Sequence, residues 1–240
     1  MPGSIKTILV PTDGSDDAIM AARVAADLAR RTGAALHLGN AWQFVTYAGD
    51  PYMYAPALPD DYFTIYEEAG RAALDDEAAR IAKDGGTVAQ THLRRGGPAD
   101  EMIALAGEIG ADLIVVGSRG LGPVRRLVMG SVSDGIVHQA HCPVLVVRGG
   151  AAAWPPQRVI VGDDGSETAA RAASFAAGLA TLYAAQGLLA RAYVPDIEMY
   201  PAGAWMRSDD LRQRAKAALG DRATALAAAF GGQPATRGAI

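Results

Sequence analysis

Short apolar runs alternate with longer segments of helical periodicity from residue 5 to residue 148. The apolar runs are typical of strands that are buried on both faces of a sheet. They occupy residues 5–12, 34–42, 87–95, 112–116 and 144–147. The helix-like segments occupy residues 15–32, 64–84, 97–110 and 132–140. Strands that alternate with helices predict an α/β fold, in which an open parallel sheet carries helices on both faces.

Capping residues support the ends of these helices. Ser15 stands where a helix N-cap is expected, and Gly33 where a left-handed residue closes a helix. Pro98 takes the first helical position, which proline favours. The first helix is therefore predicted to begin at Ser15 and to end before Gly33.

The opening of the chain recurs in its second half. Residues 8–15 (ILVPTDGS) and 159–166 (VIVGDDGS) each join an apolar strand to an Asp-Gly-Ser turn, and an alanine-rich helix follows both. Such self-similarity predicts two related domains. We expect a complete domain at 1–148, a linker at 149–156 and a truncated domain at 157–240. In the second domain a strand at 187–194 and a helix at 208–230 follow, and 236–238 echo the third strand, but nothing matches the fourth strand onwards.

Composition and charge narrow the function classes. Half of the residues are hydrophobic, which supplies a sizeable core, and the formal net charge of −4 argues against a nucleic-acid binder. Cys142 is the single cysteine, so no intrachain disulfide can form, and His138 and His141 lack the partner cluster of a metal site. No signal peptide or membrane span is evident, and we expect a cytoplasmic protein.

A glycine-rich segment between the fourth predicted strand and the next helix holds the candidate chemistry. Gly117, Gly120 and Gly130 stand in it, and glycine lets a backbone approach an anion closely. The N–H groups at the start of the next helix would then face that anion. Six side chains in or beside this segment can donate hydrogen bonds to phosphate oxygens: Ser118, Ser131, Ser133, Arg119, Arg125 and Arg126. The alternative is a sharp turn and a capped helix without a ligand.

This segment differs from two common nucleotide motifs. No Gly-Lys-Ser/Thr closes it, as a P-loop requires. No Gly-x-Gly-x-x-Gly follows the first strand, which disfavours a nicotinamide or flavin enzyme.

Asp13 lies where the first strand ends. In an open α/β sheet, ligands bind at the carboxyl ends of strands, at the point where the strand order reverses. If the first and fourth strands are neighbours, Asp13 faces the glycine segment and can hold a ribose hydroxyl or a metal on the phosphates. The alternative is an Asx turn that only starts the helix.

Together these features resemble the universal stress protein family, in its ATP-binding subclass. The likeness rests on residues 10–15 (VPTDGS) and on the spacing Gly-x2-Gly-x9-Gly-Ser from Gly117 to Ser131. It covers residues 4–148 in full and 157–240 in part. The resemblance implies a five-stranded parallel sheet of order 3-2-1-4-5, which places the first and fourth strands side by side. It also implies ATP with Mg²⁺ at that seam.

The resemblance carries roles to individual positions. Gly117, Gly120, Gly130 and Ser131 would contact the phosphates, with Arg119 and Ser133 as further phosphate ligands. Asp13 would lie near the ribose and phosphates and is the metal candidate through Mg·ATP, while Pro11 and Thr12 would line the adenine. The backbone at Asn40 and Ala41 would read the adenine edge. Ser118 and Val132 complete the expected binding set.

The second half departs from this pattern, because Gly162-Asp163 replaces Pro11-Thr12 and no phosphate segment follows. We therefore expect one ATP per chain, in the first domain. Relatives with two domains pair their fifth strands. Here residues 144–147 have no such partner in the chain, which predicts a homodimer through that edge strand.

The expected function is that of an ATP-binding regulator of the stress response, in which nucleotide occupancy modulates assembly or partner binding. It is not expected to be an enzyme, because no general base candidate stands beside Asp13. One alternative is a slow ATPase or a self-phosphorylating protein that uses Ser118, Ser131 or Ser133. Another is a scaffold whose nucleotide site is vestigial. Residues 43–63 form a loop that either packs between domains or covers the adenine.

Overall fold

A computed structural model describes residues 5–43, 62–120, 129–148, 154–191, 208–227 and 236–237. The chain divides into two compact units. The N-terminal unit spans residues 4–152, and the C-terminal unit is made mainly of residues 153–240. The division between the two falls inside the predicted linker, and each unit is described by itself.

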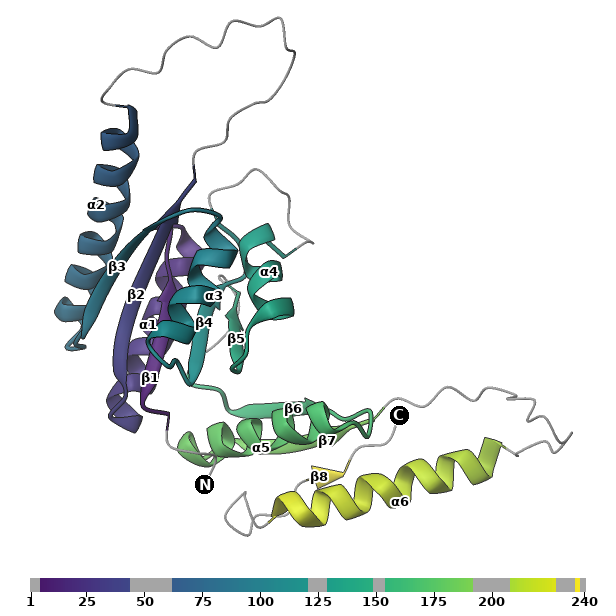
Figure 1. Ribbon diagram of the computed structural model, residues 1–240. Helices are drawn as coiled ribbons and strands as arrows, with labels where there is room; N and C mark the ends of the chain where they lie inside the picture. Colours follow the sequence, from purple (N-terminus) through teal and green to yellow (C-terminus); the bar gives the residue numbers. More distant parts are fainter. Residues whose placement is uncertain are drawn as a thin grey trace, which may run out of the picture. The chain divides into compact units, whose positions relative to one another are not determined.

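The N-terminal unit is built on one parallel five-stranded sheet. Its strands are β1 (Thr7–Pro11), β2 (Ala35–Trp42), β3 (Gln90–Arg95), β4 (Leu113–Gly117) and β5 (Val144–Val147). Their order in space is β3-β2-β1-β4-β5 (Figure 1). The order that the resemblance implied is therefore confirmed, and β1 lies beside β4.

Helices cover both faces of this sheet (Figure 1). They are α1 (Asp16–Thr32), α2 (Tyr62–Lys83), α3 (Pro98–Glu108) and α4 (Ser131–Gln139). Two successive residues of β2 show which helix covers which face of the sheet. Gly39 lies against Met102 of α3, whereas Asn40 lies against Gly70 of α2. Because successive residues of a strand point to opposite faces, α2 and α3 lie on opposite sides of the sheet.

The central strands are buried from both sides, as their continuous apolar runs predict. Leu9 and Ile114, from β1 and β4, are 0% exposed. They pack with Met102 and Leu105 of α3 and with Ile136 of α4. This cluster fixes α3 and α4 on the sheet face from which the candidate site is built.

The predicted ends of α1 are confirmed. The Ser15 side chain accepts a hydrogen bond from the Ala18 N–H, and Gly33 has a φ of 76° and donates its N–H to the Ala29 carbonyl. The third strand differs, because it begins at Gln90 instead of residue 87. Residues 87–89 join the turn after α2 to the sheet, and pairing with β2 starts only at the Ala89 N–H.

The C-terminal unit repeats the first part of this architecture. Its elements are β6 (Arg158–Gly162), α5 (Glu167–Leu182), β7 (Gln186–Ala190), α6 (Ser208–Ala227) and β8 (Thr236–Arg237). The strands are parallel in the order β6-β7-β8, which corresponds to β1-β2-β3. In the described residues no counterpart of β4, α4 or β5 occurs. Ile160 of β6 is 68% exposed, whereas Leu9 at the equivalent place in β1 is buried.

A carboxylic acid lies inside the N-terminal unit. Glu77 of α2 is 0% exposed, and its Oε2 accepts a hydrogen bond from Arg80 Nη1 at 2.7 Å. Its Oε1 has no hydrogen-bond partner among the described residues. Burial raises the pKa of Glu77, against the opposing effect of Arg80 and Arg23. The folded state therefore favours the protonated acid.

Replacing Glu77 with glutamine is expected to remove a pH-dependent loss of stability. Because the folded pKa lies above the unfolded value, the contribution of Glu77 is complete below the unfolded pKa and is lost as the pH rises through the folded pKa. The variant cannot ionise, so its unfolding free energy relative to that of the wild type should rise as the pH rises from acid to neutral. Urea unfolding across pH measures this difference, and a difference that does not change with pH would contradict the prediction.

The described helices include none that combines the length and the apolar character needed to cross a membrane.

Candidate functional site

A cavity of about 310 Å³ opens at the carboxyl ends of β1, β2 and β4. Most of the predicted site residues line it. They are Pro11, Thr12, Asp13, Ala41, Gly117, Arg119, Gly120, Gly130, Ser131, Val132 and Ser133. Among the predicted residues that the structure describes, Ser118 is the one that does not line the cavity. Sequence reasoning missed the apolar wall that Met102 and Pro98 of α3 and Val116 of β4 supply.

The strand order explains why a cavity forms here. β1 and β4 are neighbours, but the chain leaves β1 for α1 and leaves β4 for α4, and these two helices cover opposite faces. The two connections therefore diverge, and a crevice remains between them. Asp13 follows β1 and Gly120 follows β4, so the two predicted binding segments face each other across that crevice.

The three glycines of the segment differ in how much room a side chain would have. A Cβ on Gly117 would lie 2.6 Å from the backbone carbon of Asp17 and 2.7 Å from the Ala18 nitrogen, so the end of β4 packs directly on the first turn of α1. A Cβ on Gly120 would collide with Asp13 Oδ2. A Cβ on Gly130 would meet its nearest neighbour, Arg119 Cα, at 3.4 Å, an ordinary contact. Only Gly117 is required for packing of the fold itself.

The amino end of α4 faces the cavity. Gly130 is the N-cap and brings no side-chain hydrogen bond, and the first intrahelical bond runs from the Asp134 N–H to the Gly130 carbonyl. The N–H groups of Ser131, Val132 and Ser133 precede that bond and have no intrahelical acceptor. All three residues line the cavity. The positive end of the helix dipole therefore points toward any ligand bound there.

Two serine hydroxyls of the glycine-rich segment donate hydrogen bonds to other groups of the protein. Ser133 Oγ donates to the Gly117 carbonyl at 2.6 Å, and Ser118 Oγ donates to Asp17 Oδ2 at 2.6 Å. Both serines are buried. Ser131 is exposed at the cavity and is thus the predicted serine whose position suits direct contact with a ligand.

Asp17 is a site residue that sequence reasoning missed. Its carboxylate is buried in the first turn of α1 and accepts from Arg119 Nε at 3.2 Å as well as from Ser118. Ser15 Oγ also donates to the Arg119 carbonyl at 3.2 Å. These bonds join the segment after β1 to the segment after β4 and hold Arg119 at the cavity. The acidic first turn of α1 was visible in the sequence, but such residues also serve the helix dipole alone.

Asp13 makes an Asx turn and is also exposed at the cavity. Its Oδ1 accepts the Ser15 N–H at 3.0 Å, which makes an Asx turn at the start of α1. The side chain is also exposed at the cavity, where Oδ2 faces Gly120. A carboxylate in this place is of a type that binds hydroxyl groups and hydrated cations.

The part of the cavity wall near β2 is apolar, and hydrogen bonds between β1 and β2 support it. Asn40 is buried, and its Nδ2 donates to the Thr12 carbonyl at 2.7 Å. The Thr12 N–H donates to the Gly39 carbonyl at 2.8 Å, so β1 and β2 remain paired up to the cavity. Pro11, Ala41 and Met102 complete a surface suited to a flat apolar ring.

The C-terminal unit has a buried ion pair at the equivalent place. In the strand register Gly162 pairs with Ala190, as Pro11 pairs with Gly39 in the N-terminal unit. The next residues therefore correspond as well: Asp163 to Thr12, and Arg191 to Asn40. Arg191 Nε donates to the Asp163 carbonyl at 2.9 Å, as Asn40 does to Thr12. Its guanidinium also pairs with the fully buried Asp163 carboxylate at 2.6 Å, and Arg222 approaches the same carboxylate at 3.2 Å.

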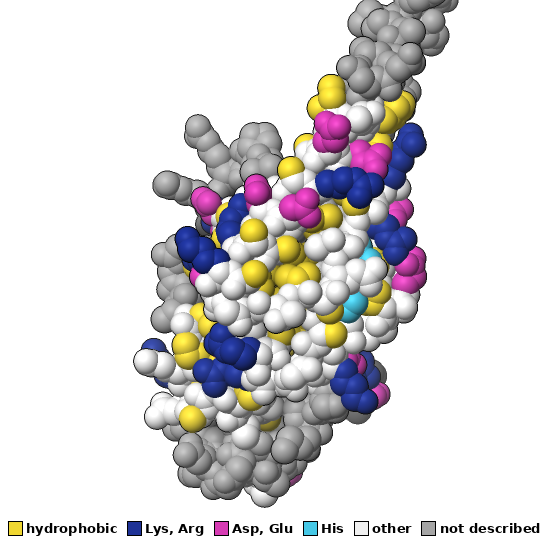
Figure 2. Space-filling view, turned by 90° about the vertical axis from the view of Figure 1, so that its left-hand side faces the viewer, with side chains coloured by type: hydrophobic (Ala, Val, Ile, Leu, Met, Phe, Trp, Pro, Cys, Tyr) yellow, Lys and Arg dark blue, Asp and Glu magenta, His cyan; other side chains and the backbone are white. Residues whose placement is uncertain are grey.

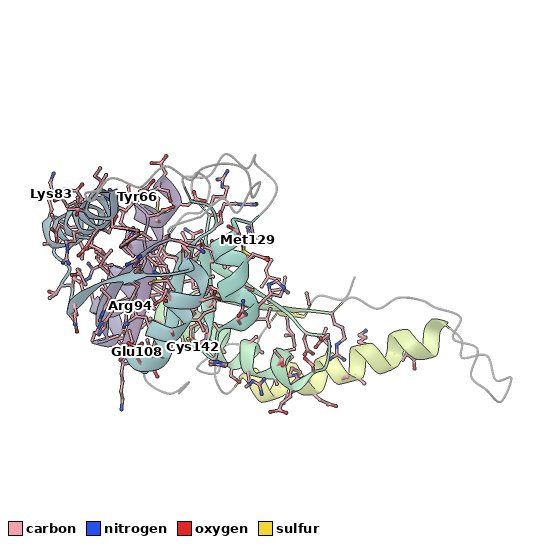
Figure 3. All side chains as sticks on the ribbon, turned by 45° about the horizontal axis from the view of Figure 1, so that its top comes forward. Tyr66, Lys83, Arg94, Glu108, Met129 and Cys142 are labelled. Carbon is pink, nitrogen blue, oxygen red and sulfur yellow. The ribbon has the colours of Figure 1, made fainter. Side chains whose placement is uncertain are left out.

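Other candidate residues contribute less. Arg125, Arg126 and most of the loop 43–63 lie outside the described residues. Cys142 is half-buried (Figure 3), and burial raises the pKa of its thiol, as expected for an unreactive cysteine. Within the described ranges, no group of three or more metal-ligating side chains is found.

Comparison with known proteins gives consistent matches. A model of the universal stress protein family matches residues 4–148. Universal stress protein MJ0531 of Methanocaldococcus jannaschii is 33% identical over 143 residues, which cover 60% of this chain and 82% of that protein. The structure of universal stress protein UspA from Lactobacillus plantarum matches with a TM-score of 0.51 and 28% identity, over 61% of this chain and 99% of that one. A universal stress protein from Archaeoglobus fulgidus aligns with 98% of this chain and 76% of its own at a TM-score of 0.66, and at 19% identity this shows the fold alone.

Proposed function

This chain belongs to the universal stress protein family, and we propose that its N-terminal unit binds one ATP with Mg²⁺ as a regulatory ligand. The observation that carries the proposal is the cavity between the ends of β1 and β4, where Gly120, Gly130 and the amino end of α4 meet. Backbone N–H groups and a helix dipole suit an anion there, and the apolar end suits a base. Nucleotide occupancy is proposed to modulate assembly or partner binding.

The residues present fit Mg·ATP. A volume of about 310 Å³ is at the low end of ligand pockets, roughly 300–1,000 Å³, and suits a nucleoside whose phosphates extend toward solvent. Ser131, Val132 and Arg119 would hold the phosphates, and Asp13 would hold the ribose or a water of the metal. When bound, Mg²⁺ neutralises phosphate charge. Pro11, Thr12 and Ala41 would contact the adenine.

The site favours binding over chemistry. Asp13 is the one carboxylate among the described residues that line the cavity, and its Oδ1 already accepts the Ser15 N–H. Hydrolysis needs a group that orients or deprotonates water, besides charge neutralisation. The Ser133 and Ser118 hydroxyls donate within the protein. A self-phosphorylating enzyme remains the second candidate because Ser131 is exposed at the cavity.

Assembly through β5 is part of the proposal. β5 pairs with β4 and ends the sheet on that side, so its other edge meets no strand among the described residues. An edge strand of four apolar residues is a template for pairing with a second copy. The Ser118 N–H donates to the Val147 carbonyl at 2.7 Å, so this strand is bonded directly to the glycine segment. A ligand bound to that segment can therefore affect the β5 edge through this hydrogen bond.

Adding Mg·ATP to the full chain is expected to raise its melting temperature while the ATP stays intact. At a ligand concentration of about 100 times Kd, binding contributes about 2.7 kcal/mol, which corresponds to about 5 °C or more for a unit of this size. Differential scanning fluorimetry measures the shift, and chromatography of the nucleotide afterwards measures its fate. An unchanged melting temperature would favour the vestigial scaffold. ADP formed well above the buffer control would favour the enzyme.

A further inference from the structure

Two histidines of neighbouring strands face each other on the α3 side of the sheet. His37 of β2 and His92 of β3 have Nδ1 and Nε2, respectively, 3.0 Å apart. Their rings are stacked at 22°, with centroids 5.3 Å apart. Both side chains are half-buried and neither lines the cavity. Figure 2 shows histidine atoms at the surface of the face that Figure 1 has at its left, where β3 forms the sheet edge.

The surroundings of both rings favour the neutral imidazole, the form that binds a metal ion. Burial lowers the pKa of His37, and burial together with the charges of His37 and Arg94 lowers the pKa of His92. Glu108 of α3 opposes this shift, but it is itself paired with Arg94 (Figure 3). A neutral imidazole has one N–H and one lone pair, so the close contact in the metal-free protein is a hydrogen bond that uses one ring proton.

We propose that His37 and His92 form a two-imidazole chelating site for a late first-row divalent transition metal, with Cu²⁺ bound most tightly. Imidazole nitrogens suit Cu²⁺, Ni²⁺ and Zn²⁺. The site is separate from the nucleotide cavity and does not depend on the proposed function.

The spacing of the two nitrogens selects among these metals. With metal–nitrogen bonds of about 2.0–2.1 Å, a 3.0 Å separation corresponds to a nitrogen–metal–nitrogen angle of about 91–97°. That angle suits the tetragonal geometry of Cu²⁺ and Ni²⁺, whereas tetrahedral Zn²⁺ needs a wider one. Cu²⁺ also stands highest in the general affinity order of divalent metals. Water would fill the remaining positions, and Glu108 is a carboxylate whose charge acts on His92.

Binding changes the tautomer of one ring and releases no net proton at neutral pH. The proton between the two facing nitrogens moves to the other nitrogen of its own ring, and both lone pairs then point to the metal. Below the pKa values of the rings, protons compete with the metal. Affinity is therefore expected to fall as the pH is lowered, with Arg94 and Glu108 as the other charged groups that act on the pair.

Titration of the tag-free full chain with CuCl₂ and NiCl₂ by calorimetry tests the proposal. Loss of an outer residue that only orients a ligand weakens metal sites about 10–100-fold, so His37→Ala or His92→Ala should weaken Cu²⁺ binding at least about 100-fold. The double variant His138→Ala with His141→Ala, which removes the remaining histidines, should retain one Cu²⁺ per chain with affinity within about twofold. Circular dichroism checks that each variant folds.

Electron paramagnetic resonance of the Cu²⁺-loaded wild type gives a readout that needs no variant. Hyperfine coupling to two imidazole nitrogens is expected. Three results would overturn the proposal: no Cu²⁺ binding by the wild type, binding that survives loss of His37 or His92, or binding lost in the control variant.

Discussion

Replacing Gly120 with alanine and Gly130 with valine is expected to abolish ATP binding while the N-terminal unit stays folded. The Cβ of residue 120 would displace Asp13 Oδ2, the end of an exposed side chain, and meets no backbone atom of the described residues outside its own neighbours. Residue 130 has a φ of −63°, which any residue adopts, and its Cβ contacts are ordinary. The added atoms would instead occupy the space from which a phosphate reaches the N–H groups of α4.

The expected loss of affinity is at least about 100-fold, because two or more hydrogen bonds to a charged group are lost and each contributes about 1.5–3 kcal/mol. Calorimetry with Mg·ATP measures it. Gly107→Ala is the matched control, since its Cβ on α3 meets no atom within 4 Å, and its affinity should stay within about twofold of wild type. A double variant that binds ATP as tightly as the control would show that the phosphates bind elsewhere.

Replacing Arg191 with alanine is expected to destabilise the C-terminal unit by about 3 kcal/mol. The substitution removes the 2.6 Å ion pair with Asp163, whose side chain is 0% exposed, and leaves the more distant Arg222 as its charged partner. It also removes the bond to the Asp163 carbonyl that holds β6 to β7. A buried carboxylate that loses its main counter-charge is among the costliest defects in a folded protein.

Hydrogen exchange followed by mass spectrometry measures this effect, because it reports on each unit separately. Amides of α5 and β7 should lose protection, whereas those of β1 and β4 should not. Arg171→Ala is the control: its ion pair with Glu167 is exposed, at 68% and 88% for the two side chains, and its loss should cost less than about 0.5 kcal/mol. Equal protection in the two variants would mean that the Arg191–Asp163 pair does not hold this unit together.

Sequence patterns predicted the features that depend on neighbouring residues. Continuous apolar runs located β1, β4 and β5, and Ser15 and Gly33 marked the ends of α1. The spacing of Gly117, Gly120 and Gly130 identified most of the cavity wall, because a strand, a loop and a helix start are contiguous in the chain. The order of the strands came from resemblance to a family, since periodicity alone does not say which strands pair.

Contacts between distant residues were not predictable in the same way. Ser118 was expected to face a phosphate, but its hydroxyl donates to Asp17, 101 residues earlier. His37 and His92 are 55 residues apart and meet only through the register of β2 and β3. Arg191 stands next to β6 at the position that Asn40 takes next to β1, a correspondence that requires both registers.

The central claim is that the cavity between β1 and β4 binds one Mg·ATP per chain and that the C-terminal unit binds none. Equilibrium dialysis of the purified full chain against radiolabelled ATP, with Mg²⁺ present, measures this number directly. The account predicts saturation at one ATP per chain, lost in the Gly120→Ala, Gly130→Val variant and retained in Arg191→Ala. Saturation at two, no binding at all, or one site that survives the glycine substitutions would contradict it.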